Sequence, residues 1–414
     1  MKQRRDFLKA AGAAGAAGAG LTLPAWAQAA GLFDIPTPQL PSGDVAESVL
    51  HALPGKRPLI KRTYRPANYE TPVEYFNEAL TPNDAFFVRW HLADIPQAPD
   101  ENSWKLKIGG DAANTPVEFS MQDLKTQFEQ VELVALCLCS GNRRGFFEPH
   151  VPGVEWSYGA MGNARWKGVR LKDVLAKAGV KHEAIEVSLN GADKGALDKT
   201  PDFIKSLPVW KALDDNTILA WEMNGQPLPV HNGYPLRLVV PGWTATYWVK
   251  MIDEIQVVSK PWSGFWMNPA YRVPLGKFPA IDRFVSQESP GGTNTPITSI
   301  VVNSLFTNIQ PGAKLAAGRT HELKGIAWDD GRGIVLVEVS EDGGRSWRDA
   351  RLGQDLGKYS WRQFSHPYTP RKKGAASVMA RATNAAGGTQ TFSLIWNPAG
   401  YNHNVVQKVD LHIA

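Results

Sequence analysis

Two cysteines, Cys137 and Cys139, are the only cysteines in the chain, and they stand two positions apart. Residues 136–144 read Leu-Cys-Leu-Cys-Ser-Gly-Asn-Arg-Arg, so a turn sequence and two arginines directly follow the second cysteine. A thiolate is a good ligand for a soft, redox-active metal, and guanidinium groups hold oxyanions through paired hydrogen bonds. The spacing therefore predicts a metal-bound cysteine beside an anion-binding site.

A buried strand is expected to carry this loop. Residues 131–138 are apolar and partly β-branched, and the following Ser-Gly-Asn interrupts the pattern. Cys139 should therefore lie at a strand end, where functional groups are often displayed. At i and i+2 of a strand, the two cysteines would have Cα atoms about 6.5 to 7 Å apart, at the edge of disulfide geometry. We expect free thiols, with Cys137 a small buried apolar residue.

The loop Cys-Ser-Gly-Asn-Arg-Arg at residues 139–144 resembles the cysteine loop of the sulfite oxidase family of molybdenum enzymes. Further similar segments occur in the same order as in that family, and together they span about residues 80–400. These segments are Phe-Phe-Val-Arg-Trp-His at 86–91, Ala-Arg-Trp-Lys-Gly-Val-Arg-Leu at 164–171, Trp-Glu-Met-Asn-Gly-Gln-Pro-Leu-Pro at 221–229, Gly-Tyr-Pro-Leu-Arg-Leu-Val-Val-Pro-Gly at 233–242 and Val-Glu-Val-Ser-Glu-Asp-Gly-Gly-Arg-Ser-Trp at 337–347.

The resemblance implies a molybdenum–molybdopterin cofactor with Cys139 as the protein ligand of the metal. It also implies a set of catalytic residues, of which Arg144 would bind the oxyanion and Tyr271 would place its hydroxyl near the metal. The implied catalytic residues are Arg89, His91, Arg144, Trp156 and Tyr271. The implied cofactor-binding residues are Phe87, Val88, Arg89, His91, Asp193, His231, Arg237, Trp248, Val249 and Lys250. The apolar residues after Arg237 make an unpaired charge costly there, which favours an anionic partner.

Three positions depart from the family pattern. Asn232 stands between His231 and the Gly-Tyr-Pro that the family places directly after its histidine. Ala399 replaces an arginine that vertebrate members carry near the C-terminus, and Pro152 replaces a pocket lysine. Substrate affinity is therefore expected to rest on fewer cations, or the pocket accepts a different sulfur compound.

The chain is expected to form two domains of α+β class after a removable leader. Residues 1–29 match a twin-arginine export signal, and 30–80 read as an arm over the surface. Residues 81–280 mix strand and helix patterns, which predicts a mixed α/β molybdopterin-binding catalytic domain. Short strands and turn residues predict an immunoglobulin-like β-sandwich over 281–414, which the resemblance identifies as a dimerisation domain.

Export as a folded protein suits a cofactor inserted before secretion, so a periplasmic location and a twin-arginine export partner are expected. Removal of the leader takes away four basic residues and one acidic residue, so the net charge falls from +5 to +2. A nearly neutral mature protein argues against nucleic acid as a partner.

The resemblance implies oxidation of sulfite, or of a related small sulfur oxyanion, to sulfate. No Cys-x-x-Cys-His haem site occurs in the sequence, so a separate c-type cytochrome is the expected electron acceptor. A homodimer through the C-terminal domain is a further expectation. Three alternatives stay open: the molybdenum subunit of a sulfane dehydrogenase complex acting on protein-bound sulfur, a sulfoxide reductase, and a non-catalytic β-domain binding protein.

Overall fold

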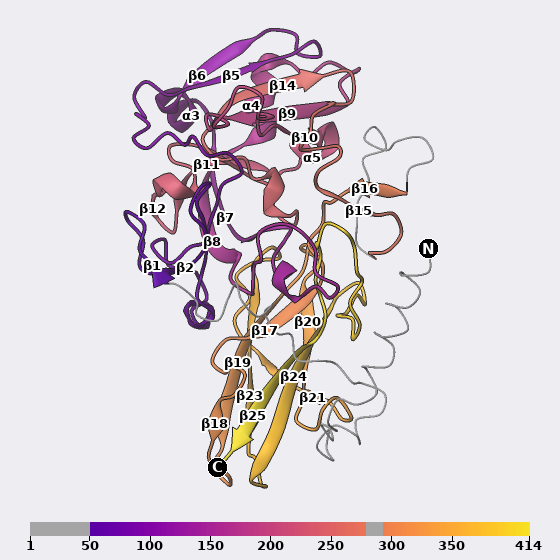
Figure 1. The fold of residues 1–414 in the computed structure, drawn as a ribbon. Helices are drawn as coiled ribbons and strands as arrows, with labels where there is room; N and C mark the ends of the chain where they lie inside the picture. Colours follow the sequence, from indigo (N-terminus) through magenta and orange to yellow (C-terminus); the bar gives the residue numbers. More distant parts are fainter. Residues whose placement is uncertain (1–49, 279–292) are drawn as a thin grey trace, which may run out of the picture.

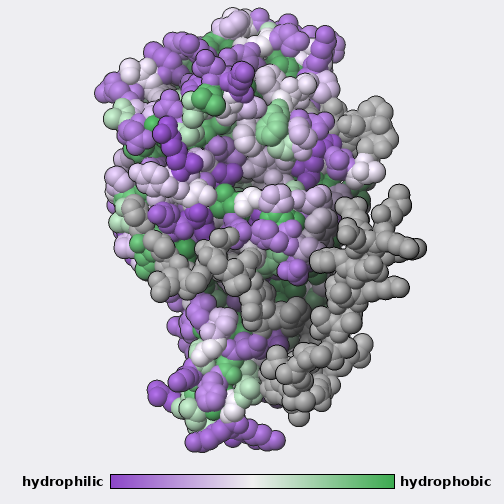
Figure 2. Space-filling model, viewed as in Figure 1, coloured by the Kyte–Doolittle hydropathy of each residue, from purple (hydrophilic) through white to green (hydrophobic). Residues whose placement is uncertain are grey.

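The computed structural model describes residues 50–278 and 293–414, which form two domains joined end to end (Figure 1). The expected export signal at 1–29, the start of the expected arm at 30–49 and the expected domain boundary at 280 lie outside the described residues. The described part contains no helix that is long and apolar enough to span a membrane. On the face seen in Figure 2, hydrophilic residues predominate and the apolar patches are small and separate.

Three sheets build the first domain, and they are drawn at the top of Figure 1. The first pairs, in spatial order, β1 (Leu50–His51), β2 (Leu59–Thr63), β3 (Asn68–Glu70) and β4 (Val88–Arg89). The second pairs β10 (Lys205–Pro208), β9 (Glu186–Gly191), β14 (Ile252–Val258), β5 (Lys105–Gly109) and β6 (Val117–Ser120). The third pairs β12 (Gln226–Pro227), β11 (Ile218–Met223), β8 (Met161–Arg170) and β7 (Gln130–Leu138), with β13 (Arg237–Val239) on β11.

The helices of this domain are short. They are α3 (Met121–Gln127), α4 (Leu171–Ala178), α5 (Val209–Ala212) and the 3₁₀ turns η1 (Val73–Asn77), η2 (Arg144–Phe146), η3 (Val230–Asn232) and η4 (Ala245–Tyr247). The amphipathic pattern predicted α4, which buries Leu171, Val174 and Leu175. The α+β class is confirmed, although strands outnumber helices in the described residues.

β7 carries the cysteine loop as the sequence predicted. Its last five residues are buried, it pairs antiparallel with β8 along its whole length, and it ends at Leu138. Cys139 follows immediately, at the strand end. Both cysteines are free thiols. Both expectations are confirmed. A strand that is buried on both faces needs a continuous apolar run, so the run and its end can be recognised in the sequence.

Residues 50–80, the described part of the expected arm, correct that expectation. Instead of lying over the surface, they supply β1, β2, β3 and η1, with Tyr69 and Phe76 fully buried. β3 pairs with β4, and the Asn68 side chain accepts a hydrogen bond from Arg89 at 3.1 Å. The prolines and polar residues of this segment gave no sign of its two roles, which are to complete a sheet with β4 and to support the site residue Arg89.

The second domain is a two-sheet sandwich, as predicted, and it is drawn at the bottom of Figure 1. A two-stranded pair, β15 (Arg272–Pro274) with β16 (Asn294–Pro296), precedes it. One sheet pairs β17 (Asn303–Phe306), β19 (His321–Trp328), β23 (Arg362–Tyr368) and β22 (Arg351–Leu352). The other pairs β18 (Lys314–Leu315), β25 (Gln407–Ile413), β24 (Gly374–Asn384), β20 (Ile334–Ser340) and β21 (Arg348–Asp349).

The predicted Asp-Gly-Gly turn after β20 is present, and each of its residues has a structural role. Gly343 and Gly344 both have positive φ, at 74° and 90°, which other residues rarely adopt. The Asp342 carboxylate accepts backbone hydrogen bonds from Arg345 and Ser346 at 3.0 and 2.9 Å. Turn chemistry thus directs the chain from β20 toward β21.

The two domains share a buried apolar cluster directly behind β7. Phe76, Leu136 and Met161 of the first domain pack with Trp328 and Trp361 of the second. The backbone N–H of Leu136 also donates to the carbonyl of residue 359 at 2.9 Å. The sandwich therefore supports the strand that ends in the cysteine loop.

Candidate active site

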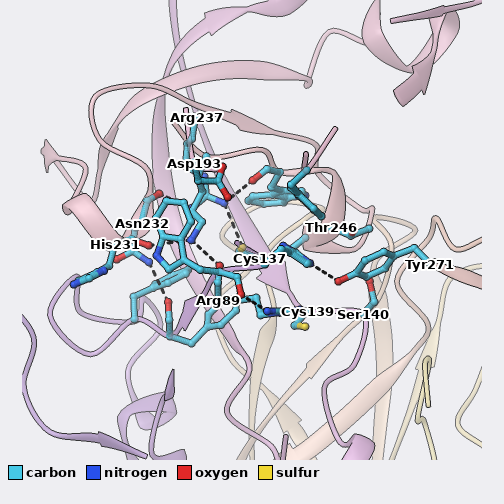
Figure 3. Close-up of a pocket in the computed structure, with 18 residues that line it drawn as sticks. Arg89, Cys137, Cys139, Ser140, Asp193, His231, Asn232, Arg237, Thr246 and Tyr271 are labelled. Atoms are coloured by element: carbon cyan, nitrogen blue, oxygen red, sulfur yellow. Dashed lines mark hydrogen bonds between the residues drawn. The ribbon is translucent and has the colours of Figure 1, made fainter. Parts of the chain in front are cut away.

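A cavity lies in the first domain, beside the cysteine loop (Figure 3). Tyr271 lies toward one side of it and His231 toward the other, with both cysteines between them. Ten of the residues that the sequence predicted for the site line this cavity. They are Phe87, Arg89, His91, Cys139, Asp193, His231, Arg237, Trp248, Lys250 and Tyr271.

The turn after β7 fixes Cys139. Its backbone N–H donates to the carbonyl of Ala160 at 2.9 Å, and its own carbonyl accepts from the N–H of Asn142 at 3.0 Å. With both backbone groups held, only the thiol remains to face the cavity. Cys137 also lines the cavity, where burial raises the pKa of its thiol to about 11. Cys137 is therefore buried and protonated, as its expected structural role requires.

The two arginines of the loop point to different places. Arg143, with φ at +68°, donates to the Ser304 carbonyl of the second domain at 2.7 Å. Arg144 instead donates to the Ala399 and Val154 carbonyls at 3.0 and 3.1 Å. The Arg144 guanidinium lies over the ring of Tyr401, which stacks on the cavity-lining Tyr271, and its implied role in oxyanion binding stays a prediction.

Glycines make the space that Arg144 occupies. A Cβ atom at Gly141 would lie 2.5 Å from an Arg144 terminal nitrogen, and one at Gly400 would lie 2.7 Å from its Cγ. A Cβ at Gly153 would approach the same guanidinium to 2.9 Å. Real Cβ atoms do not approach so closely, so the position of this arginine depends on glycine at these sites.

A group of cations, Arg89, Arg237 and Lys250, faces the cavity without carboxylate ion pairs in the described chain. Their donors reach backbone carbonyls instead; Arg237, for example, donates to the Asn232 carbonyl at 2.8 Å. The Arg237 Nε is buried and has no hydrogen-bond partner among the described residues. Buried cations need a compensating charge, so this arrangement fits an anionic group such as a phosphate.

One acid, Asp193, lies within this group. Burial raises the pKa of its carboxyl to about 6, and the nearby Lys250 opposes that change. Burial lowers the pKa of Lys250 well below its ordinary value, and Arg237 lowers it further. His231 is likewise held neutral, because burial lowers its pKa to about 4. Asn232, which interrupts the family pattern, lines the cavity beside His231.

His91 and Tyr271 form the other side of the cavity. The His91 ring stacks on Phe203, with ring centres 3.7 Å apart, and its Nε2 is hydrogen-bonded to the Tyr271 hydroxyl. Burial lowers the pKa of His91 well below its usual range, and the neighbouring Arg89 adds to this effect. Tyr271 has a φ of +59°, which is unusual for a residue with a bulky side chain.

Four residues of the predicted set do not line the cavity. Val88 and Val249 are buried in the core on either side of lining residues. Arg144 is separated from the cavity by Tyr401, whose ring it covers at 5.2 Å. Trp156 is fully buried, and its indole N–H has no hydrogen-bond partner in the part of the chain that the structure describes. The structure therefore brings together the predicted cofactor set more fully than the predicted catalytic set.

Sequence reasoning missed two buried lysines near the cavity. Lys56, in the expected arm, donates to the Asn83 and Phe86 carbonyls at 2.6 and 3.1 Å, and burial lowers its pKa to about 7. No local pattern marks it. Lys205 begins β10, and its position in the apolar run Phe-Ile-Lys-Ser-Leu-Pro at 203–208 was an available signal, because a lysine inside a strand is rarely buried.

The donor set fits a cofactor that brings its own metal ligands. Among residues 50–278 and 293–414, no group of three or more His, Cys, Asp or Glu side chains is placed to hold a metal ion. The free thiols of Cys139 and the buried Cys137, cations without carboxylate ion pairs, and the aromatic walls of Phe86, Phe87 and Trp248 are present instead. Such a site suits a phosphate-bearing ring system that carries a thiolate-binding metal.

Residues 92–266 match the family model for an oxidoreductase molybdopterin binding domain, and residues 294–414 match the Mo-co oxidoreductase dimerisation domain. The mitochondrial sulfite oxidase of Macaca fascicularis is 33% identical over 380 residues, which cover 87% of this chain and 67% of that protein. The chain belongs to the sulfite oxidase family. Its cofactor is therefore molybdenum–molybdopterin, and its fold is the molybdopterin domain followed by the immunoglobulin-like dimerisation domain.

Other sulfite oxidase family proteins show the extent of the likeness. The sulfite oxidase of Arabidopsis thaliana is 27% identical, over 87% of this chain and 95% of that protein. The sulfane dehydrogenase SoxCD from Paracoccus pantotrophus has a crystal structure that superposes with a TM-score of 0.72 at 24% identity, covering 89% of this chain and 90% of that one. This likeness extends the shared fold across both domains.

Proposed function

We propose that this molybdenum oxidoreductase converts sulfite to sulfate in the cavity beside Cys139. The observation that carries the proposal is the convergence of the free Cys139 thiol, in a single cavity, with Arg89, Arg237 and Lys250, which form no carboxylate ion pair in the described chain. The similarity to sulfite oxidases supports the choice of substrate. Sulfite and water would give sulfate, two protons and two electrons, so the reaction requires an electron acceptor.

The cofactor would be held at both ends of the cavity. Cys139 would supply the thiolate, while Arg237, Lys250 and His231 would face the phosphate and ring system, with Asp193 as an acceptor for ring donors. When bound, molybdenum supplies oxygen-atom transfer and takes up the two electrons. Trp248 and Phe87 would cover the ring faces and limit water in the cavity.

The substrate side would act through charge and position. Arg89 and Arg144 would offset the negative charge of sulfite, directly or across the tyrosine rings. Neutral His91 would keep the Tyr271 hydroxyl oriented, and that hydroxyl would donate to an oxygen of the oxyanion. These groups are already fixed by stacking and hydrogen bonds, so little reorganisation accompanies binding.

We further propose that the electrons leave singly to a c-type cytochrome in the periplasm. The sequence has no Cys-x-x-Cys-His haem site, and its first residues match a twin-arginine signal that would deliver the folded protein there. A homodimer through residues 294–414 is the assembly that the dimerisation domain supports.

A second function is supported by the fold likeness to the sulfane dehydrogenase. In this alternative, the same cavity would accept sulfur carried on a partner protein instead of free sulfite. Ala399 and Pro152 favour it, because neither adds a cation for a free dianion.

One experiment separates these functions. The chain is expressed in a host that makes molybdopterin, its molybdenum content is measured, and cytochrome c reduction is followed after addition of free sulfite. We expect one molybdenum per chain and sulfite-dependent reduction, with neither in Cys139→Ser. Full molybdenum content without sulfite turnover would favour protein-bound sulfur, and a chain without molybdenum would contradict both functions.

A further inference from the structure

Lys205 is a fully buried lysine that the site assignment above does not use. It begins β10, and its ammonium donates to the backbone carbonyl of Trp266 at 2.6 Å. In the described part of the chain, it forms no ion pair with a carboxylate; the charged group that affects it is Arg272, another cation. An ammonium buried in this way is costly, so its position calls for a compensating role.

Lys205 lies at one end of a stack that runs to the cysteine loop. Its Nζ lies 4.8 Å from the ring centre of Tyr271. The Tyr271 ring stacks on Tyr401, with centres 5.5 Å apart and planes 9° apart, and Arg144 lies 5.2 Å from the Tyr401 ring. Two cations therefore enclose a pair of tyrosine rings, and each cation is attracted by the ring that it faces.

Tyr271 depends on this stack for its position. Its φ of +59° is an unfavourable backbone conformation that surrounding contacts must maintain. Its hydroxyl meets His91 at the cavity wall. Lys205 and Tyr401 both contact the Tyr271 ring, so Lys205 acts on the cavity through Tyr271 without lining it.

The protonation of Lys205 is sensitive to charge in the cavity. Burial lowers the pKa of its ammonium well below the ordinary value, and Arg272 lowers it further. Tyr247 contributes a second ring face at 4.7 Å, while Glu186 on the neighbouring strand is engaged by the Ser206 hydroxyl at 2.6 Å. His91, whose pKa Lys205 itself lowers, completes the surroundings. A negative charge entering the cavity would therefore favour proton uptake by Lys205.

We propose that Lys205 is a positioning residue, which holds Tyr271 toward the substrate and adds positive charge when a divalent oxyanion binds. This inference rests on the proposed function and deepens it. The replacements at Ala399 and Pro152 led us to expect fewer cations for the substrate, and Lys205 supplies one more. The ligand class is a small tetrahedral or pyramidal oxyanion of sulfur.

The test compares molybdenum-loaded wild type with Lys205→Met, which keeps side-chain length and removes the charge. Inorganic sulfate, the product anion, is titrated calorimetrically in two buffers of different ionisation enthalpy. We expect sulfate Kd and sulfite KM to rise about tenfold, which is the size expected of a unit charge about 12 Å away at an effective dielectric constant of about 20. Proton uptake on binding should fall, and kcat should change less than KM.

Lys211→Met is the matched control. Lys211 is also buried and faces a ring, that of Trp243, but it pairs with Asp214 at 2.9 Å. It should lower stability and leave sulfate affinity and proton uptake unchanged. If Lys205→Met does not fold, Lys205→Gln retains a donor for the Trp266 carbonyl and should weaken sulfate in the same way.

Two outcomes overturn the proposal differently. Sulfate affinity and proton uptake equal to wild type in a folded Lys205 variant would overturn the role of Lys205 alone. A fully loaded wild type that neither binds sulfate nor oxidises sulfite would overturn the proposed function, and this inference with it.

Discussion

The Tyr271 hydroxyl is hydrogen-bonded to Nε2 of His91, a residue 180 positions away in the sequence. The histidine comes from the segment after β4, and the tyrosine from the segment just before β15. Because burial and Arg89 keep the pKa of His91 well below its usual range, the ring is neutral. In the tautomer with the proton on Nε2, the ring donates to the Tyr271 oxygen and leaves the hydroxyl proton free for an oxyanion. The pair therefore fixes the direction of a hydroxyl that faces the cavity.

Replacing Tyr271 with Phe should keep the ring stack with Tyr401 and remove only the hydroxyl. We expect kcat/KM for sulfite to fall about tenfold to a hundredfold, the usual cost of one oriented donor at a reacting anion. Steady-state kinetics give the value. Tyr247→Phe, whose hydroxyl donates to the Ile297 carbonyl at 2.7 Å, is the control and should affect stability only. Equal kinetics in wild type and Tyr271→Phe would remove the hydroxyl from the mechanism.

Cys139→Ser should retain the fold and lose turnover by several orders of magnitude, because a serine hydroxyl is rarely ionised near neutral pH. Cys137→Ser is the matched variant two residues away. Its thiol is protonated and buried, so this change should lower stability with little effect on rate. Circular dichroism and sulfite kinetics are measured on both. Near-normal turnover in Cys139→Ser would show that the metal lies elsewhere.

Gly141→Ala tests the position of Arg144 without changing its charge. A Cβ at Gly141 would meet the Arg144 guanidinium at 2.5 to 2.6 Å, so the side chain must move. We expect sulfite KM to rise about tenfold through loss of a charge-assisted contact. Gly109→Ala is the control, since its nearest atoms lie 3.6 Å away. An unchanged KM in Gly141→Ala would mean that Arg144 does not serve the substrate.

His403 should make stability depend on pH. Burial lowers its pKa to about 3, and Arg143 contributes to that shift. The folded state therefore takes up a proton only near pH 3, whereas the unfolded chain takes one up near 6.5. This contribution is fully present above about pH 6.5 and is lost as the pH falls, by roughly 2 kcal/mol at pH 5.

The measurement is the unfolding midpoint between about pH 7 and 5. His403→Phe should flatten the decline, because no proton is then taken up on unfolding at this position. His182→Gln is the control, since that side chain is 98% exposed and should leave the decline as in wild type. The same decline in His403→Phe as in wild type would show that His403 is not buried in neutral form.

Local patterns predicted the elements that carry the site. The apolar run before Cys139 gave a buried strand, the amphipathic spacing of 171–178 gave a helix, and the turn residues after 340 gave the sandwich hairpins. These predictions succeeded because the burial of one or both faces of an element requires a regular spacing of apolar residues in its sequence. The cofactor residues came from the family resemblance, and most of them converge on one cavity.

The failures have a common physical cause, which is contact between distant segments. The arm that became β1 to β3 lacks an apolar period, because its role is to close a short sheet against β4. The roles of Lys56 and Lys205 depend on contacts with residues from distant segments of the chain. Trp156 was placed in the pocket by likeness alone, and its side chain packs in the core instead. No local signal marks the arm, Lys56 or Trp156, whereas Lys205 stands in an apolar run that could have indicated its burial.

Arg143 limits how the two domains can be exchanged between proteins. Its guanidinium crosses from the cysteine loop to the Ser304 carbonyl, while its neighbour Arg144 reaches the Ala399 carbonyl. The boundary between the domains thus runs through the catalytic loop. A chimera that joins this first domain to the sandwich of a relative would have to transplant residues 397–405 together with residues 139–145. The two domains are separate in architecture, but at this boundary they have to be exchanged as one unit.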